Sequence, residues 1–378
     1  MALRIGVSKE RMAGERRVAL VPEVVARLSK QGWEVLVERG AGELSYFPDS
    51  AYAEAGAQLA DADGVSQAEV IVGVQPPEAA QIARLRRGQL LISFLHVHRN
   101  GEAVTALRDA GVTSFAMERI PRITRAQAMD VLSSQATVSG YRAALMAADL
   151  SPSFFPMLTT AAGTIRPARV LVLGAGVAGL QAIATARRLG AVVEAYDVRR
   201  AAREQVESLG AKFLQVEMDA EAEGGYAREL TAEEKEREQV LLRKSIAQAD
   251  VVITTAQIPG RPAPQLIATS TVHDMKPGSV IIDIAAETGG NCEATRPGER
   301  IEIDGVSVYG PLHVPSQLPV HASVMYAKNM QNFLGLLRGE DGSLRVDWND
   351  EILASSVVTH DGAIPVEAVR AAIGGTGS

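Results

Sequence analysis

The sequence predicts an α/β fold with two doubly wound domains, the second of them a Rossmann-type dinucleotide-binding domain. The first third of the chain alternates short apolar runs with amphipathic runs, as in a parallel sheet that helices cover on both faces. A second series of apolar runs begins near residue 166, and its first turn is rich in glycine. Two domains also suit a length of 378 residues. We expect a discontinuous first domain at 1–128 and 322–378, and a second domain at 129–321.

Strands and helices alternate regularly in the expected first domain. Short apolar runs predict strands at 4–8, 34–40, 68–75, 89–96 and 112–120. Amphipathic runs predict helices at 22–32, 50–60, 79–88 and 101–111. Pro22, Gly32 and Gly56 stand at the ends of these helices, where proline and glycine are favoured.

The expected second domain repeats this pattern with one long insertion. Strands are predicted within 166–179, 190–199, 210–217, 249–256, 278–285 and 305–310, and the insertion occupies 218–249. It is longer than the usual connection of about 2–6 residues plus one helix. Beyond it we expect a helix at 321–337 and short strands at 343–348 and 355–362, which return the chain to the first domain. Helices near 125–145 and 321–337 are expected to join the two domains.

Composition excludes several classes of protein. A formal charge of -7 argues against a surface for nucleic acid or for anionic membranes. The single cysteine, Cys292, excludes an internal disulfide and fits a reducing compartment. Charged residues occupy the N-terminal region where a signal peptide needs an apolar run, and we expect no transmembrane helix.

The glycine-rich turn predicts a binding site for a dinucleotide. Gly174, Gly176 and Gly179 follow an apolar strand directly and open a helix, and Asp197 ends the next strand. The glycines permit a tight turn and close approach of the backbone, and the start of the helix receives the pyrophosphate. An acid at the position of Asp197 binds the ribose diol and repels a 2′-phosphate, which favours NAD over NADP. Arg199 and Arg200 could instead serve a phosphate or be solvated residues.

A second polar cluster lies at 124–143, in "TRAQAMDVLSSQATVSGYRA". We read it as the first turns of a helix, with Gln127, Asp130, Ser133 and Ser134 on one side. The stretch has no Cys, His or Lys, so the cluster is expected to hold a ligand rather than to move protons. The alternative is structural: Thr124 and Gln127 fit a capping box, and the serines could bond to the preceding turn.

At this point the sequence resembles a known family. The motifs "KERMAGERRVALVPEVV", "TTAQIPGRPAPQLI" and "MKPGSVIIDIAAETGGNCE" are similar to alanine dehydrogenase and to the NAD(H)-binding part of proton-translocating nicotinamide nucleotide transhydrogenase. The motifs "RITRAQAMDVLSSQ" and "GGYA" resemble the transhydrogenase branch specifically. The resemblance covers essentially the whole chain.

This resemblance implies an enzyme that works within a complex. It implies NAD(H) bound in a cleft, no metal, and a homodimer built through the nucleotide-binding domains. Its partners would be an NADP(H)-binding subunit and a membrane-spanning subunit, which would hold the chain on the cytoplasmic face of the inner membrane. NADH would pass its hydride directly to NADP⁺ on the partner, and the membrane partner would couple this transfer to proton translocation.

The resemblance also assigns roles to individual residues. It places Arg122, Gln127, Asp130 and Ser133 near the nicotinamide and its ribose. Tyr226, next to the flexible pair Gly224–Gly225, would fold over bound nucleotide. The alternative is a surface loop with an exposed tyrosine, which would have the same sequence. The cofactor-binding residues expected in all are Gly174, Gly176, Val177, Ala178, Gly179, Asp197, Val198, Arg199, Tyr226, Ala256, Gln257, Ile258 and Pro259.

Departures from the alanine dehydrogenase pattern favour the transhydrogenase branch. Oxidising an amino acid needs positioned acid–base groups, whereas hydride transfer between two nicotinamides needs only orientation and exclusion of water. Gly73 and Gln75 stand where the dehydrogenase pattern has lysines, and Glu287 stands where it has an aspartate. Arg17 and His96 remain, the latter either catalytic or a packed core histidine. An alanine-type dehydrogenase and a non-catalytic NAD(H) sensor are the alternatives.

Overall fold

The computed structural model describes residues 3–215, 232–258, 261–339 and 341–374, which divide into two compact units. Unit 1 comprises Met1–Gln135 and Pro315–Ser378, and unit 2 comprises Ala136–Val314. These limits differ slightly from the expected domains at 1–128 with 322–378 and at 129–321. Both units are α/β with mostly parallel sheets, which confirms the predicted fold class.

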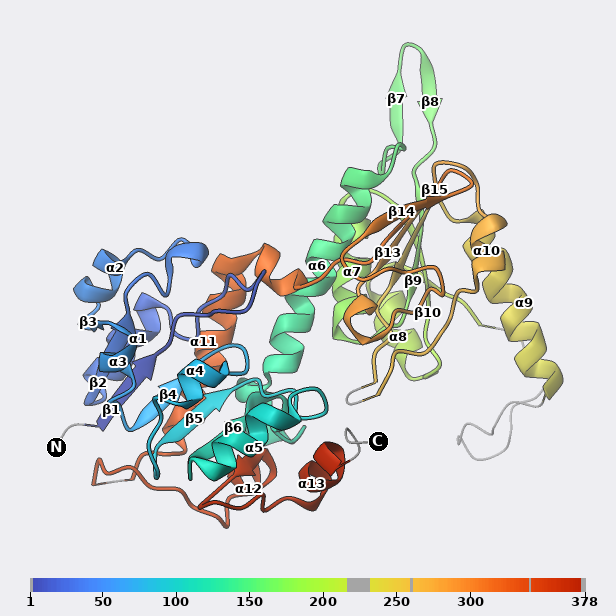
Figure 1. Cartoon of the computed structure of the whole chain (residues 1–378). Coiled ribbons are helices and arrows are strands. Elements are labelled where there is room, and N and C mark those ends of the chain that lie inside the picture. The colour runs from blue at the N-terminus through green and yellow to red at the C-terminus, as the bar shows by residue number, and fades with distance from the viewer. Residues whose placement is uncertain (1–2, 216–231, 259–260, 340, 375–378) are drawn as a thin grey trace. The chain divides into compact units, whose positions relative to one another are not determined.

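Unit 1 contains a seven-stranded sheet in the order β16-β6-β5-β4-β1-β2-β3. All neighbouring strands are parallel except β16, which runs antiparallel to β6 at one edge. The strands are β1 (Leu3–Val7), β2 (Trp33–Glu38), β3 (Gln58–Ala60), β4 (Val70–Val72), β5 (Leu90–Ser93), β6 (Thr113–Ala116) and β16 (Val357–Thr359). Helices α1 (Pro22–Lys30), α2 (Asp49–Glu54), α3 (Ala62–Val65), α4 (Ala79–Ile82) and α5 (Gly101–Asp109) connect them, as Figure 1 shows.

Alternation along the central strands builds a core on each face of the unit 1 sheet. Val70 and Val72 pack in one core with residues of α1 and of α11 (Pro319–Gly335), while Ile71 between them packs in the other core with residues of α4 and α5. The strands read as continuous apolar runs because both faces are covered. The functional side chains are therefore left to the loops that follow the strands.

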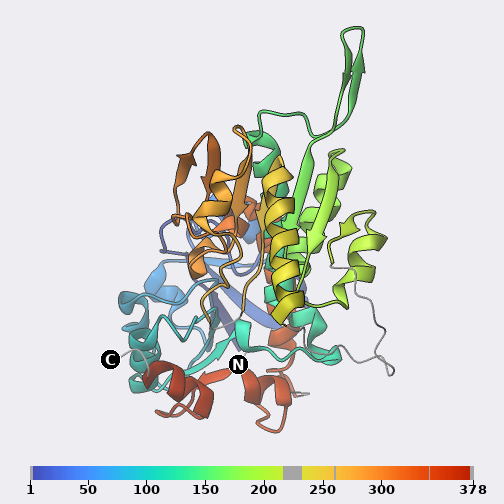
Figure 2. The ribbon, with the colours of Figure 1, turned by 90° about the vertical axis from the view of Figure 1, so that its right-hand side faces the viewer.

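Unit 2 repeats this plan with the strand order β11-β10-β9-β12-β13-β15-β14. Its strands are β9 (Arg169–Leu173), β10 (Val192–Tyr196), β11 (Lys212–Phe213), β12 (Val251–Thr254), β13 (Val280–Asp283), β14 (Arg300–Ile303) and β15 (Val306–Tyr309). Only β14 is antiparallel to its neighbour. Helices α7 (Val177–Arg188) and α8 (Ala202–Ser208) pack on one face, and α9 (Ala232–Gln248) and α10 (Thr269–His273) pack on the other (Figure 2).

The structure corrects several details of the sequence prediction. The run expected as one helix at 50–60 is α2 followed by the short edge strand β3. The strand expected at 343–348 is only an isolated bridge between Arg338 and Leu344, and the run at 355–362 is the end of α12 (Glu351–Ser356) followed by β16. One junction between the units falls within α6 (Val131–Leu150), whereas α11 belongs wholly to unit 1.

Unit 2 also carries a hairpin that projects away from its sheet (Figures 1 and 2). Strands β7 (Leu158–Thr160) and β8 (Gly163–Ile165) pair only with each other. Met157 and Ile165 are 63% and 46% exposed, and the nearby Phe154 is 56% exposed. Among the described helices of the whole chain, none combines the length and the apolar character needed to span a bilayer.

Candidate functional site

The carboxyl edge of the unit 2 sheet gathers most of the predicted nucleotide-binding residues. Strands β9 and β12 are adjacent, but the chain leaves them toward opposite sides of the sheet. Such a switch point opens a crevice at the carboxyl ends of parallel strands, where dinucleotides bind. The loops that follow β9, β10 and β12 carry Gly174, Asp197 and Ala256 respectively, so residues far apart in sequence meet at one edge.

The three glycines of the turn have three different physical roles. Gly174 has a φ of 97°, in the left-handed region that favours glycine. A Cβ on Gly179 would lie 1.8 Å from the Gly174 carbonyl oxygen, so this glycine lets α7 pack directly against the turn. A Cβ on Gly176 would meet only the Arg199 guanidinium, at 4.0 Å, which leaves space for a ligand. The turn therefore fits a pyrophosphate at the start of α7.

Helix α7 is held in place by a close helix crossing that no sequence motif predicts. A Cβ on Gly140, in α6, would lie 2.0 Å from the carbonyl oxygen of Ala178 in the first turn of α7. Only a glycine permits this approach, because the obstacle is backbone and cannot move aside. Gly140 thus fixes the amino end of α7, where Val177 is 42% exposed.

Asp197 closes the same edge from the end of β10. Its carboxylate accepts hydrogen bonds from the Ala175 backbone N–H at 2.7 Å and the Arg199 backbone N–H at 2.8 Å. The Arg199 guanidinium donates two more, both at 3.0 Å. Burial opposes the charged form, but the bonds from Arg199 and Ala175 together outweigh it and lower the pKa of Asp197 below its ordinary value. An ionised acceptor at this position suits a ribose diol and disfavours a 2′-phosphate.

The loop after β12 is positioned by a buried polar network that the sequence analysis missed. Asp283 at the end of β13 is fully buried and accepts bonds from the Thr254 and Thr295 hydroxyls and from the backbone N–H of Asn291. The Asn291 side chain then bonds both the N–H and the carbonyl of Ala256, at 3.0 and 2.8 Å. Only the position of Asp283 at a strand end could have signalled this role.

The remaining predicted nucleotide-binding residues fall into two groups. Val198 is 78% exposed and Ile258 is 46% exposed, while Gln257 donates from Nε2 to the Ile284 carbonyl at 3.0 Å. These residues border the same edge. Tyr226 and Pro259, together with Gly224–Gly225, lie outside the described residues. The role of each predicted residue toward a coenzyme stays a prediction.

The polar stretch near residue 124 lies in unit 1 and has an unexpected local structure. A 3-10 helix spans Thr124–Met129, and α6 begins only at Val131. No side chain caps the 3-10 helix, so the structural alternative, a capping box of Thr124 and Gln127, is wrong. Asp130 starts α6 instead: its carboxylate accepts from the Ser133 backbone N–H at 2.9 Å and the Ser133 hydroxyl at 2.6 Å.

The exposed side of this stretch keeps two long polar side chains available. Arg122 and Gln127 are exposed, and their side chains make no hydrogen bond or ion pair with other described residues. Arg125, by contrast, forms two 2.7 Å bonds with Asp350 and anchors the turn to the start of α12. Ser134 bonds the Val131 carbonyl at 3.1 Å, as the structural alternative expected.

Arg17, which could anchor a substrate carboxylate, is already fully engaged within unit 1. Its Nε and Nη2 donate to the two oxygens of Glu15 at 2.8 and 2.6 Å, and Nη1 donates to the Gln135 side chain at 2.9 Å. Both charged residues are buried, at 5% and 2% exposure. Burial alone would raise the pKa of Glu15, but Arg17, with Ser316 and Gln75, lowers it to about 2. The guanidinium is therefore neutralised internally.

Two other residues at positions of the dehydrogenase machinery also have local roles. His96 is exposed, with φ of 44°, and its ring stacks on Phe94 at 5.3 Å, so the packed core histidine is wrong. Its backbone N–H donates to Glu118 at 2.6 Å. In unit 2 the Glu287 carboxylate accepts from the His313 backbone N–H at 2.6 Å.

Comparison with known proteins gives matches along the whole chain. Residues 6–139 match the family described as "Alanine dehydrogenase/PNT, N-terminal domain", and residues 143–367 match its C-terminal domain. The first polypeptide of the NAD(P) transhydrogenase alpha subunit of Rhodospirillum rubrum is 47% identical over 374 residues, covering 96% of this chain and 97% of the relative. The alanine dehydrogenase of Mycobacterium tuberculosis is 32% identical over 389 residues, covering 98% and 97%.

Solved structures give the same two relationships. The transhydrogenase from Sinorhizobium meliloti superimposes with a TM-score of 0.86 at 44% identity, covering 97% of this chain and 99% of that structure. An L-alanine dehydrogenase superimposes with a TM-score of 0.84 at 26% identity, covering 99% of both chains. The fold alone does not separate the two activities, so the side chains must.

Proposed function

Because the chain belongs to the alanine dehydrogenase/PNT family, we propose that it is the NAD(H)-binding subunit of a proton-translocating NAD(P) transhydrogenase. In this role it binds NADH and passes hydride to NADP⁺ that a partner subunit holds. The observation that carries the proposal is the internal engagement of Arg17 by Glu15 and Gln135, beside Gln75 where a dehydrogenase pattern has lysine. The 47% identity to a transhydrogenase subunit over nearly its full length supports it.

The proposed reaction requires little acid–base catalysis by the protein. NADH supplies the hydride, and the acceptor is a second nicotinamide, so no proton is exchanged at the reacting carbon. The protein contributes binding, orientation and exclusion of water. Gly73 and Gln75 at the lysine positions, and an Arg17 neutralised by a carboxylate, suit this task. Arg17 in this state offers no free cation to an amino-acid carboxylate.

Each polar cluster then has a distinct task. The turn at Gly174–Gly179 and Asp197 hold the pyrophosphate and the adenosine ribose, and Asn291 fixes the loop at Ala256. Arg122 and Gln127 orient the nicotinamide end, since their side chains are exposed and make no bond to other described residues. Asp130 and Ser133, bonded to each other, act as one preorganised pair.

Partners complete the proposed enzyme. The NADP(H)-binding and membrane-spanning subunits supply the second nucleotide and the proton path, and they hold this chain at the cytoplasmic face of the inner membrane. The chain itself pairs as a homodimer through unit 2. The hairpin of β7 and β8 supports this, because an isolated two-stranded hairpin is marginally stable, and Ile165 within it and Met157 next to it are exposed.

Alanine dehydrogenase activity is the competing function, and one assay separates the two. Purified chain is incubated with L-alanine and NAD⁺, and NADH formation is followed. The proposal predicts no NADH above the rate without L-alanine, while the same protein still binds NADH in a fluorescence titration. Turnover of L-alanine at a typical enzymatic rate, on the order of 1–10³ s⁻¹, would replace the proposal with a dehydrogenase.

A further inference from the structure

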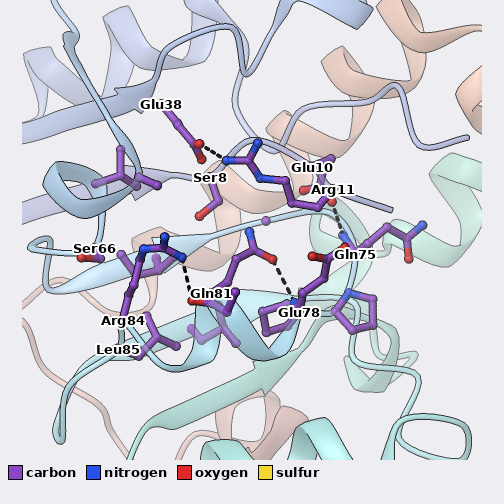
Figure 3. Close-up of a pocket in the computed structure, with 18 of the residues that line it drawn as sticks. Ser8, Glu10, Arg11, Glu38, Ser66, Gln75, Glu78, Gln81, Arg84 and Leu85 are labelled. Atoms are coloured by element: carbon purple, nitrogen blue, oxygen red, sulfur yellow. Dashed lines mark hydrogen bonds and ion pairs between the residues drawn. The ribbon is translucent and has the colours of Figure 1, made fainter. Parts of the chain in front are cut away.

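Unit 1 contains a pocket at the position where unit 2 carries its predicted nucleotide crevice. The order β3-β2-β1-β4-β5-β6-β16 corresponds strand for strand to β11-β10-β9-β12-β13-β15-β14, including the antiparallel last strand. The switch point of unit 1 is therefore between β1 and β4, as that of unit 2 is between β9 and β12. A cavity of about 260 Å³ opens at this switch point (Figure 3).

Equivalent segments line the two sites. In unit 1 the loop after β1 contributes Ser8, Glu10 and Arg11, the end of β2 contributes Glu38, and the loop after β4 contributes Gly73 and Gln75. The wall is completed by apolar residues of the sheet, of α3, of α4 and of the turn after α4: Val65, Ile71, Ala80, Leu85 and Leu91. The lining thus combines an apolar wall with convergent polar groups, as small-molecule sites do.

Glu38 corresponds to Asp197 in both position and bonding. Glu38 is the last residue of β2, and Asp197 directly follows β10, the strand at the same place in the order of its sheet. Asp197 accepts from a backbone N–H of the loop after β9 and pairs with Arg199; Glu38 accepts from the Lys9 N–H at 2.8 Å and pairs with Arg11. The Glu38 side chain is 8% exposed, against 7% for Asp197. Such an acid suits a ribose diol.

We propose that this pocket is a second binding site, which takes a nucleoside monophosphate. Glu38 accepts the ribose hydroxyls, and the base lies against the apolar wall of Leu85 and Leu91. Gln81 stands at that wall with its side-chain oxygen bonded to the Glu78 N–H at 2.9 Å, and its amide nitrogen makes no bond within the described chain. That nitrogen can donate to the edge of a base.

The pocket differs from unit 2 in a way that excludes a dinucleotide. No glycine-rich turn follows β1, and α1 begins only at Pro22, so no helix start receives a pyrophosphate. Two arginines replace it, Arg11 and Arg84, both labelled in Figure 3. Arg11 pairs with Glu38, and Arg84 pairs with Asp63 at 2.8 Å, but their side chains are 39% and 41% exposed, so these pairs can open toward a phosphate at little cost. Guanidinium groups bind a single phosphate well. The volume also suits a small metabolite rather than NAD.

The charges that line the pocket are mixed, with Glu38 and Glu78 beside Arg11 and Arg84, and Glu10 adds little negative charge to them. The Glu10 carboxyl accepts from the Val74 and Gln75 N–H groups at 2.6 and 3.1 Å, and its burial raises its pKa to about 8. At pH 7 this carboxyl is mostly protonated and repels a phosphate little. The Ser8 hydroxyl, which points into the pocket in Figure 3, can donate to the ligand.

Binding of AMP to the NADH-saturated chain tests the proposal. Saturating NADH occupies the unit 2 crevice, and equilibrium dialysis with labelled AMP then measures what remains. We expect one AMP bound per chain with a Kd no weaker than about 1 mM. No saturable binding to the NADH-saturated chain would overturn the proposal. NADH titrated separately reports on unit 2, so a failure there is distinguishable from a failure of the unit 1 site.

A matched pair of substitutions on α4 locates the bound AMP. Ala80 and Ala79 are both exposed on this short helix, but only Ala80 lines the pocket. Ala80→Trp should weaken AMP binding at least tenfold, and Ala79→Trp should leave it unchanged. Thermal unfolding of both variants checks that they fold. Equal AMP affinity in the two variants would place the ligand elsewhere and contradict the proposal.

The expected contact between Arg84 and the phosphate of AMP is tested with a substitution of Arg84 and with ligands that lack either the phosphate or the nucleoside. Arg84→Gln should weaken AMP binding about tenfold and leave adenosine binding unchanged, whereas Arg87→Gln, close to it in sequence and outside the pocket, should change neither. Inorganic phosphate alone should compete weakly. Adenosine that binds as tightly as AMP, or phosphate that competes as well as AMP, would contradict a nucleoside monophosphate site.

Discussion

The two units share a strand order but use their sheet edges differently. In unit 2 the chain passes from β9 through one glycine turn into α7, so a helix start faces the crevice. In unit 1 the chain leaves β1 and runs through residues 8–21 before α1 begins at Pro22. The long loop instead brings Glu10, Glu15 and Arg17 inward. The fold provides the crevice, and the first loop decides what it can bind.

The charges of the two edges differ as well. Asp197 and Arg199 of unit 2 pair at the rim, where the guanidinium side chain is 63% exposed. Glu15 and Arg17 of unit 1 pair inside, at 0% and 6% side-chain exposure. A rim pair can open to admit a ligand at little cost, whereas a buried pair is a fixed structural element. The Asp197–Arg199 pair of unit 2 can therefore open when a ligand binds. The Glu15–Arg17 pair of unit 1 stays formed.

The largest expected effect is in the glycine turn of unit 2. Gly179→Ala places a Cβ 1.8 Å from the Gly174 carbonyl, and we expect it to cost unit 2 more than about 4 kcal/mol and to abolish NADH binding. Gly176→Ala is the control, because its Cβ meets only Arg199 at 4.0 Å. It should keep the fold and weaken NADH binding alone. Urea unfolding and NADH fluorescence measure both; equal stability of the two variants would contradict these roles.

The next effect is in the buried pair of unit 1. Glu15→Gln leaves Arg17 charged and unpaired, and we expect it to destabilise the chain by about 3 kcal/mol at pH 7. The pKa of Glu15 is lowered from 4.5 to about 2, so its stabilisation is present above pH 4.5 and is lost as the pH falls from there toward 2. Urea unfolding across this range should show that loss in the parent chain and a smaller one in Glu15→Gln.

A smaller effect separates ligand orientation from helix capping. Asparagine also caps helices, so Asp130→Asn should change the free energy of unfolding by less than about 1 kcal/mol. Its lost charge should slow hydride transfer about tenfold while the Kd for NADH changes less than about threefold. Asp61→Asn, at the start of α3, is a matched capping control that should change neither. Equal losses of transfer rate and NADH affinity in Asp130→Asn would remove the orienting role.

The smallest effect concerns Glu10, whose contribution to stability falls as the pH rises, opposite to that of Glu15. Burial raises the pKa of Glu10 from 4.5 to about 8, with Glu15 raising it further and Arg17 lowering it. Its stabilisation is therefore complete below pH 4.5 and is lost as the pH rises toward 8. Between pH 6 and 7 the parent chain should lose about 1 kcal/mol that Glu10→Gln does not lose. Parallel curves for the two proteins would show that Glu10 is ionised in the folded chain.

Sequence patterns predicted the parts of the structure that depend only on residues close together in the chain. The glycine turn and the central strands were predictable because each depends on neighbouring residues: Gly174 on its own φ and β9 on one apolar run. The edge strand β3 was missed because Gln58–Ala60 is short and follows a helical run without a break. The start of α6 was placed too early, because Thr124 and Gln127 matched a capping pattern that Asp130 fulfils instead.

Long-range contacts account for what the sequence could not predict. Asp283 fixes the Ala256 loop through Asn291, and nothing in either residue's neighbourhood signals this. Gly140 matters only because α7 crosses α6 at that residue. The pocket near Glu38 likewise has no motif, since its walls come from strands, loops and short helices that lie far apart in the sequence. Such features appear only once the sheet order is known.

Isotope transfer shows whether hydride passes directly from one bound nicotinamide to the other. NADH deuterated at the transferable C4 position is bound to the chain, which is then mixed with NADP⁺ on its partner subunit in ordinary water. We expect the NADPH formed to carry the deuterium, with none lost to solvent and no need for an amino or keto acid. NADPH that contains solvent hydrogen, or formation that requires L-alanine or pyruvate, would contradict direct transfer between two bound nicotinamides.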